Sequence, residues 1–177
     1  MIERTSTASW RGRVPEGSGC VSLGSGAFEG PYSFGSRFEA QAGTNPEELL
    51  GAAHASCFSM ALSLLLTEAG YTPARISTLA KVRIERSGNG FAITHIALAT
   101  EGEVEGVDAR TFAAHAEVAR RACPVSKALT GVEISLVAKL LEASGSVAPR
   151  GPAAGAAPRA RAQVMGRRGS ERFQETR

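Results

Sequence analysis

An α+β fold is predicted from the order in which the expected elements follow one another along the 177 residues. Three short strands come first, a long apolar helix follows, and a strand pair, two helices and a last strand complete the order. Strands and helices that come in runs favour an α+β fold over a doubly wound parallel sheet. A chain of this length is most simply one domain, large enough to bury its own core.

The N-terminal region is predicted to form an antiparallel meander. Its three strands are expected at residues 10–14, 19–23 and 32–38, and glycines separate them. Short strands divided by turn residues at regular spacing are typical of such a meander.

A long helix with a clear start is expected next. Asn45 is a good N-cap, Pro46 suits the first helical position, and Glu48 stands where it completes a capping box. The helix continues to Gly70 and is apolar nearly all round, with small residues such as Gly51. Such a helix is expected to be buried, and its small residues let other backbone approach closely.

The second half of the chain is predicted to hold a β-hairpin, two helices and a last strand. The hairpin turn is expected at residues 87–90, with glycine where a positive φ is wanted. Asp108 caps the first helix, and Pro124 opens the second because proline disfavours helical geometry at Cys123. The expected ranges are 75–86 and 91–100 for the hairpin, 109–122 and 124–129 for the helices, and 132–138 for the strand.

The charge is distributed unevenly between a folded domain, predicted at residues 1–141, and a tail at 142–177. The formal net charge is +3, but from residue 143 onward seven arginines face two glutamates, a local charge of +5. The tail is rich in Ala, Gly, Pro and Arg and has little to bury, so it is predicted to be disordered. A basic tail can bind nucleic acid, but a passive solvated extension is the favoured interpretation.

A cytoplasmic location without membrane insertion is expected. No apolar run reaches the roughly 18 residues that span a membrane. The first residues lack the basic and then apolar stretches of a secretory signal. Three widely spaced cysteines do not form a secreted disulfide framework and are expected to be free, buried or catalytic.

Two cysteines stand in settings that differ chemically. Cys57 lies inside the apolar helix, where burial raises a thiol pKa and makes the thiol inert unless a cation is held nearby. Cys123 is expected at a helix N-cap, where unpaired amides favour a thiolate. From the residues alone, Cys57 is a core residue and Cys123 the more reactive one, while Cys20 is expected to serve packing. Two cysteines on separate elements can trap a sulfenic acid as a disulfide.

Three charged residues are candidates for assisting a thiolate. Arg37 interrupts a predicted strand and is, taken alone, an exposed strand arginine. At about 100° per residue, Glu47 falls roughly 80° from Cys57 around the helix axis and Glu48 roughly 180°. Glu48 has the capping role, so Glu47 is the better functional carboxylate, although both also stabilise the helix dipole.

Two other chemistries compete for Cys57. His54 shares a helix face with it at i and i+3, which suits a Cys–His hydrolase or acyltransferase. The same spacing could form half of a metal site, but the remaining candidates His95, His115 and Cys123 show no tight spacing. A hydrolase also needs an oxyanion hole and an orienting residue, which the sequence does not show, and no Gly-rich phosphate loop supports nucleotide binding.

The segment at residues 43–62, GTNPEELLGAAHASCFSMAL, closely resembles the OsmC branch of the OsmC/Ohr family of thiol peroxidases. The resemblance extends to residues 32–39, 90–94 and 122–126 and covers about residues 8–140. It implies an intertwined homodimer with antiparallel sheets wrapped around a long buried central helix, and two active sites at the subunit interface.

The resemblance also implies a role for each candidate residue. Cys57 is similar to the peroxidatic cysteine of the family and Cys123 to the resolving one. Arg37 resembles the arginine that holds the thiolate. Glu47 resembles the carboxylate that positions this arginine, with Glu48 as the alternative because the two glutamates are adjacent.

The implied reaction is peroxide reduction in oxidative or osmotic stress defence. The Cys57 thiolate attacks the hydroperoxide and becomes a sulfenic acid, Cys123 closes a disulfide, and an external thiol reductant restores both. No metal, flavin or nucleotide is required. An apolar wall from Phe58, Met60 and Phe34 is expected to favour organic hydroperoxides over hydrogen peroxide.

Overall fold

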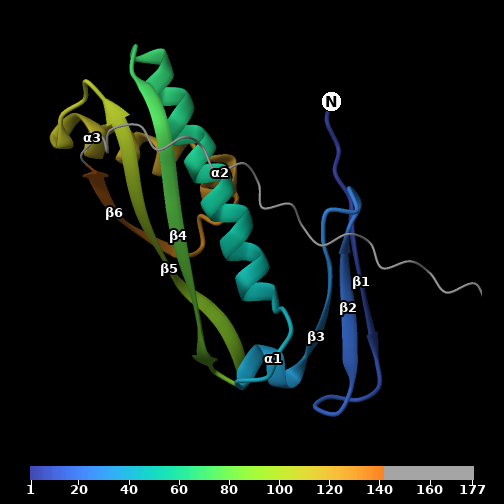
Figure 1. The fold of residues 1–177 in the computed structure, drawn as a ribbon. Helices are drawn as coiled ribbons and strands as arrows, with labels where there is room; N and C mark the ends of the chain where they lie inside the picture. The colour runs from blue at the N-terminus through green and yellow to red at the C-terminus, as the bar shows by residue number, and fades with distance from the viewer. Residues whose placement is uncertain (142–177) are drawn as a thin grey trace, which may run out of the picture. The chain divides into compact units, whose positions relative to one another are not determined.

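Two three-stranded sheets and four helices make up residues 1–141, which are the residues that the computed structural model describes (Figure 1). The tail at 142–177, and the disorder predicted for it, lie outside the described residues. The α+β class is confirmed. The elements in order are β1 (Ser6–Arg11), β2 (Ser18–Leu23), β3 (Glu29–Ser33), α1 (Phe34–Phe38), α2 (Pro46–Glu68), β4 (Thr72–Ser87), β5 (Gly90–Glu105), α3 (Ala109–Ala122), α4 (Pro124–Ala128) and β6 (Glu133–Leu141).

The N-terminal sheet is the expected antiparallel meander β1-β2-β3, but its third strand is shorter than predicted. β3 ends at Ser33 and the helix α1 follows, so the strand predicted over 32–38 is wrong from residue 34 onward. The first strand, predicted over 10–14, is also displaced, because β1 ends at Arg11. Two serine hydroxyls account for the difference. Ser33 Oγ accepts from the Ser36 amide at 3.0 Å, and Ser36 Oγ accepts from the Ser33 amide at 2.9 Å. This capping box starts a helical turn, so Arg37 lies on a helix and not on a strand.

The N-terminal sheet has no buried face within the described residues. Five of the six residues of β1 are exposed, and no residue of β2 is buried. A sheet needs one face covered to be stable in water. Residues 1–141 of one chain therefore leave both faces of this sheet uncovered.

The second sheet has the order β4-β5-β6 and is mixed. β4 and β5 form the predicted antiparallel hairpin, with Gly88 at φ 57° in its turn. β6 pairs parallel with β5, so the prediction of purely antiparallel sheets is wrong here. The connection through α3 and α4 explains this, because a long helical crossover permits parallel pairing and a tight turn does not.

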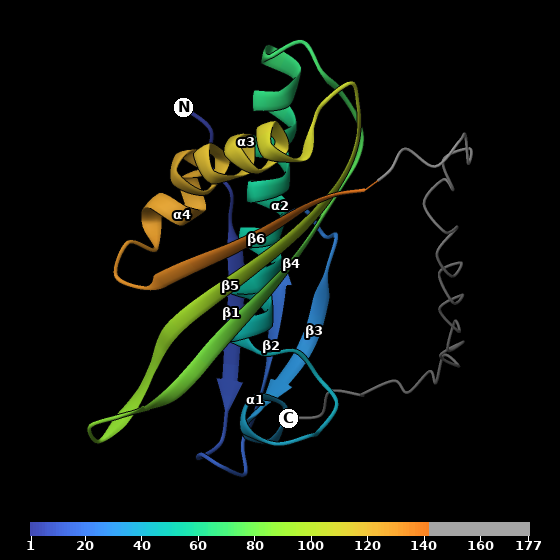
Figure 2. The same cartoon turned by 90° about the vertical axis from the view of Figure 1, so that its left-hand side faces the viewer.

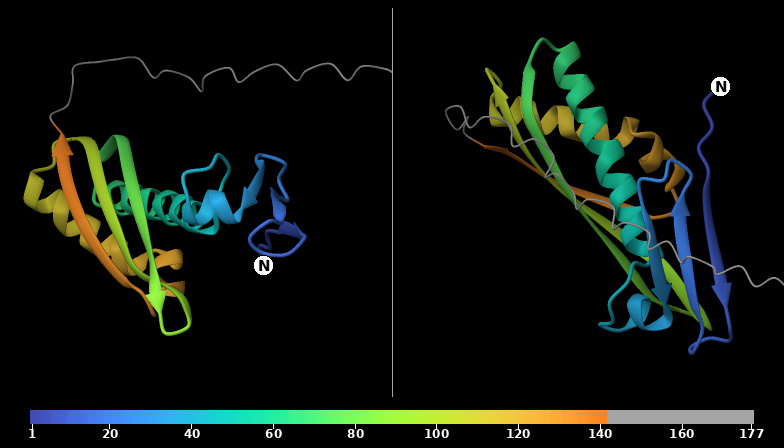
Figure 3. Two further views of the ribbon diagram at one scale, coloured as in Figure 1. Left: turned by 90° about the horizontal axis from the view of Figure 1, so that it is seen from below. Right: turned by 45° about the vertical axis from the view of Figure 1, so that its right-hand side comes forward.

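The core lies between α2, α3 and one face of this sheet. α2 runs alongside β4, and α3 crosses α2 (Figures 1, 2 and 3). Gly51 faces Ala80 and Val82 of β4, and a Cβ at this position would stand 3.4 Å from Val82 Cγ2, an ordinary van der Waals separation. The fully buried hydrophobic side chains of the core are Phe58, Leu62, Leu66, Ile96, Leu98, Phe112, Ala116 and Ala119.

Within residues 1–141 only one stripe of α2 is buried, so the burial predicted for this apolar helix is confirmed on that stripe alone. The buried residues recur every three or four positions and are Glu47, Gly51, His54, Phe58, Leu62 and Leu66. On other faces Met60 is 74% exposed and Leu64 58%. A helix that is apolar beyond its buried stripe exposes a surface suited to a partner.

The start of α2 follows the prediction, apart from one bond. Asn45 Oδ1 accepts from the Glu48 amide at 2.9 Å, and Pro46 is the first helical residue. Within residues 1–141 the Glu48 side chain makes no return bond, so only half of the predicted capping box forms.

The length of α2 corrects the expectation that no apolar segment is long enough to span a membrane. Its 23 residues, with a mean hydropathy of 1.7 over the most apolar part, are long and apolar enough to cross one by length and composition alone. The core helix of a soluble protein meets the same criterion, and α2 packs on β4 and α3. The cytoplasmic location remains a prediction.

Candidate active site

Cys57 and Cys123 lie together although 66 positions separate them in the sequence. Cys57 Sγ and Cys123 Sγ are 2.8 Å apart, and both thiols are free. Cys57 is half-buried and Cys123 is fully buried. This reverses the burial order expected from the residues alone, in which Cys57 belonged to the core.

Cys123 is held by the junction between two helices. Its amide donates to the Ala119 carbonyl at 2.9 Å and ends α3, while its carbonyl accepts from the Lys127 amide at 3.0 Å in α4. It thus occupies the predicted N-cap before Pro124, but its sulfur makes no capping hydrogen bond and contacts Cys57. The junction therefore presents the Cys123 thiol to α2.

The electrostatics of the sulfur pair oppose ionisation. Burial raises the pKa of the Cys57 thiol above its ordinary value, and the neighbouring Cys123 thiol raises this pKa further. The backbone amide of Val125, in the first turn of α4, lowers the pKa of Cys57 in part. Only the thiolate of a cysteine is nucleophilic, and among residues 1–141 no cation lowers the pKa of Cys57.

An apolar pocket opens beside Cys57. It is lined by Met60, Ala61, Leu64, Leu65, Ala122 and Pro124. Of the three residues predicted to form an apolar wall, only Met60 lies here. Phe58 is fully buried in the core, and Phe34 lines a different pocket, next to Arg37.

Arg37 and Glu47 form an ion pair at the N-terminal end of α2. Arg37 Nε donates to both carboxylate oxygens of Glu47 at 3.2 Å, and Nη2 donates to Oε1 at 2.7 Å. The Glu47 side chain is 9% exposed, whereas Glu48 faces solvent. The structure thus pairs Arg37 with Glu47, the glutamate that helix geometry favours.

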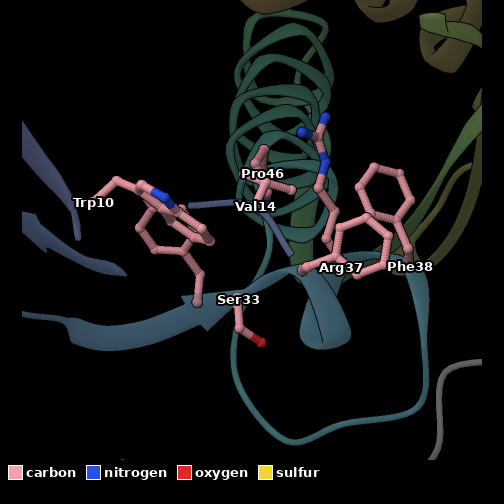
Figure 4. Close-up of a pocket in the computed structure, with 8 residues that line it drawn as sticks. Trp10, Val14, Ser33, Arg37, Phe38 and Pro46 are labelled. Atoms are coloured by element: carbon pink, nitrogen blue, oxygen red, sulfur yellow. The ribbon is translucent and has the colours of Figure 1, made fainter. Parts of the chain in front are cut away.

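Aromatic side chains frame the Arg37 guanidinium. Its Cζ lies 5.1 Å from the centre of the Phe38 ring, and Figure 4 shows this ring beside the arginine side chain, with Trp10 across the pocket. The pocket is lined by Trp10, Val14, Tyr32, Ser33, Phe34, Arg37, Phe38 and Pro46. A guanidinium that is fixed by a carboxylate and an aromatic face keeps a defined direction.

Arg37 makes no contact with Cys57 of its own chain within the described residues, so the contact expected between them is absent there. Its ion-pair partner Glu47 lies ten residues before Cys57 on one continuous helix. At 1.5 Å per residue this separation is about 15 Å along the axis. The sulfur pair and the Arg37–Glu47 pair are therefore two separate half-sites in a single chain.

His54 does not pair with Cys57. Its Nε2 lies 2.8 Å from Ser126 Oγ in a buried hydrogen bond, and its Nδ1 has no partner among the described residues. The Cys–His pair that a hydrolase needs is thus not formed. Within residues 1–141, no three His, Cys, Asp or Glu side chains gather closely enough to hold a metal ion. Sequence reasoning missed Ser126, whose small polar side chain gives no signal by itself.

A fold with two free thiols in contact beside an apolar pocket defines a thiol-based redox protein, and comparison with known proteins agrees. A protein-family model described as OsmC-like protein matches residues 38–137. The chain is 52% identical to Peroxiredoxin OsmC of Escherichia coli (strain K12) over 136 residues, which are 76% of this chain and 94% of the relative. Peroxiredoxin OsmC of Shigella flexneri matches with the same identity and coverage.

Solved structures of related proteins share the fold. An organic hydroperoxide resistance protein from Elizabethkingia anophelis superposes with a TM-score of 0.64 at 26% identity, covering 80% of this chain and 98% of that one. OhrB of Bacillus subtilis, also an organic hydroperoxide resistance protein, superposes with a TM-score of 0.61 at 25% identity, covering 76% and 98%. The chain belongs to the OsmC-like family, and it is a thiol-dependent peroxidase.

Proposed function

We propose that the protein reduces organic hydroperoxides to alcohols, and hydrogen peroxide less well, in oxidative or osmotic stress defence. The observation that carries the proposal is the 2.8 Å contact between the sulfurs of Cys57 and Cys123. Two thiols at this distance can store a two-electron oxidation as a disulfide. Cys57 is the attacking thiol because it borders the apolar pocket, whereas Cys123 is fully buried.

The proposed reaction has three steps. The Cys57 thiolate attacks the distal peroxide oxygen, the O–O bond breaks, and the leaving alkoxide takes a proton to become the alcohol. Cys123 then attacks the sulfur of the Cys57 sulfenic acid, so that the S–O bond breaks and water leaves. An external thiol reductant supplies two electrons and two protons and restores both thiols.

A second copy of the chain completes the site in this proposal. Burial raises the pKa of Cys57. Within the described residues the only arginine fixed by a buried carboxylate is Arg37 of α1, which pairs with Glu47 at the N-terminal end of α2. The apolar surface of α2 around Met60 and Leu64 and the uncovered N-terminal sheet suit a homodimer interface. In such a dimer Arg37, fixed by Glu47, stabilises the Cys57 thiolate of the other chain and the charge on the leaving oxygen.

The mass of the intact protein tests the proposal directly. After one equivalent of an organic hydroperoxide we expect a loss of about 2 Da, mapping to a Cys57–Cys123 disulfide, because closing the bond removes two hydrogens. A Cys20→Ser variant is the control and should show the same loss. An unchanged mass, or a disulfide that includes Cys20, would contradict the scheme.

Substrate preference is expected to depend on the apolar pocket. Met60→Gln keeps the length of the side chain but adds a polar amide, so kcat/KM for an organic hydroperoxide should fall about tenfold, with hydrogen peroxide little affected. Leu79→Gln is the matched control, because Leu79 is an exposed apolar residue (55%) outside the pocket. Steady-state rates with both peroxides measure this preference. Equal turnover of the two peroxides by the unaltered protein would contradict it.

The adjacent glutamates are expected to respond differently to the same change. Glu47→Gln replaces the buried carboxylate that fixes Arg37, so kcat/KM should fall about tenfold through loss of a charge-assisted bidentate pair. Glu48→Gln should stay near the unaltered rate because this side chain faces solvent. If Glu48→Gln proved the more damaging, the positioning role would belong to Glu48.

A further inference from the structure

Two side-chain contacts connect α2 to the segment around α4, and they lie next to each other. Cys57 contacts Cys123 with a sulfur separation of 2.8 Å, and His54 contacts Ser126 at 2.8 Å. His54 precedes Cys57 by three residues, and Ser126 follows Cys123 by three. The hydrogen bond therefore lies one helical turn from the sulfur contact on both segments.

α4 packs on α2 and α3, but few of its side chains contribute polar contacts. It is five residues long, too short to be stable without tertiary contacts. The side chain at its N-cap makes no capping bond, and Ser126 is the one residue of the helix that is buried. The Ser126 hydroxyl thus provides a side-chain polar contact between α4 and α2, in addition to the Val125 amide that lies at Cys57.

Packing alone does not account for His54. The side chain is fully buried, and its Nδ1 has no partner among residues 1–141. A buried polar atom without a partner is costly, whereas an apolar side chain would fill the same space at no such cost. The imidazole is consistent with a role exerted through its other nitrogen, which contacts Ser126.

We propose that the His54–Ser126 hydrogen bond positions the resolving thiol, so that both are positioning residues for closure of the disulfide. The inference rests on the proposed function and adds to it that these two residues act on one step of the reaction. The bond serves the step in which Cys123 attacks the sulfenic sulfur of Cys57, the S–S bond forms, the S–O bond breaks and water leaves. Its effect on the attack of Cys57 on the peroxide is expected to be smaller, because neither His54 nor Ser126 lines the apolar pocket through which the peroxide approaches.

The test separates the two steps in single-turnover experiments. Ser126→Ala and His54→Leu each remove one end of the bond, and peroxide consumption and disulfide closure are then followed separately by rapid quenching and mass spectrometry. We expect peroxide consumption at the unaltered rate, and closure slowed about tenfold or more. Excess peroxide should then convert Cys57 to the sulfinic acid, a gain of about 32 Da, because the sulfenic acid lives longer.

Three further variants sharpen the result. His54→Gln places an amide nitrogen near the position of Nε2 and should restore fast closure, which a merely space-filling role would not require. The double variant should close no more slowly than the single ones if both residues act through one bond. Ser56→Ala is the matched control, because this exposed α2 hydroxyl donates only to the Ala53 carbonyl of its own helix.

The outcomes distinguish the inference from the function on which it rests. Normal closure in Ser126→Ala, or an equal loss of both steps together with a lower Tm, would overturn the positioning role. Ser126→Ala removes a single oxygen, so the result does not depend on the folding of His54→Leu. A protein that consumes peroxide but never closes a Cys57–Cys123 disulfide would contradict the proposed function itself, and the positioning role with it.

Discussion

Replacing Cys57 with serine is expected to lower peroxide turnover at least about a thousandfold, because it removes the attacking nucleophile. A serine hydroxyl stays protonated at neutral pH and forms no sulfenic acid, while its size leaves the packing beside Cys123 nearly unchanged. The measurement is the rate of organic hydroperoxide loss with an excess of thiol reductant. Full activity in this variant would assign the chemistry to another residue.

The Cys123→Ser variant should behave differently from Cys57→Ser, and comparing the two variants distinguishes the attacking thiol from the resolving thiol. Its first turnover should proceed, since Cys57 and the apolar pocket remain, and a sulfenic acid should accumulate that a sulfenic-acid-specific reagent can trap. No internal disulfide should form, and repeated exposure should over-oxidise Cys57. Cys20→Ser serves as the control, because Cys20 lies on β2, away from the sulfur pair. A Cys123→Ser protein without a first turnover would contradict the assignment of roles.

The elements that the sequence predicts well are those with local signals. Asn45 and Pro46 mark the start of α2, and Gly88 marks the hairpin turn, because capping and positive φ depend on a few adjacent atoms. The strand predicted at residues 32–38 failed for a related reason. The two hydroxyls of Ser33 and Ser36 outweigh the aromatic pattern of that segment and start a helical turn.

Local sequence signals do not predict the non-local features of the fold and the site. The parallel pairing of β6 depends on how the crossover packs, and no residue of β6 encodes it alone. Cys57 and Cys123 were also ranked wrongly by burial, because an all-apolar helix does not reveal which of its faces the sheet covers. Helix geometry did favour Glu47 over Glu48, since rotation around a helix axis follows from sequence spacing.

Arg37→Ala is expected to lower kcat/KM about a hundredfold at neutral pH and to move the pH–rate profile upward. The direction follows from the thiolate. A nearby cation favours the charged form of Cys57, so its loss raises the pKa of a thiol that burial already raises. The rate should therefore rise with pH in both proteins, with the rise displaced to higher pH in the variant. A pH–rate profile that does not shift would show that Arg37 does not stabilise the Cys57 thiolate.

Subunit mixing then tests whether Arg37 acts on the Cys57 of its own chain or of a partner. In a heterodimer of one Arg37→Ala chain and one Cys57→Ser chain, isolated through two different tags, action across the interface leaves one intact site of two. About half of the unaltered activity should then return, although each homodimer is nearly inactive. Action within a chain leaves no intact site and restores nothing. The roughly 15 Å between Glu47 and Cys57 along one helix favours the first result, because an arginine bound to Glu47 at the start of α2 cannot reach a sulfur in the middle of the same helix.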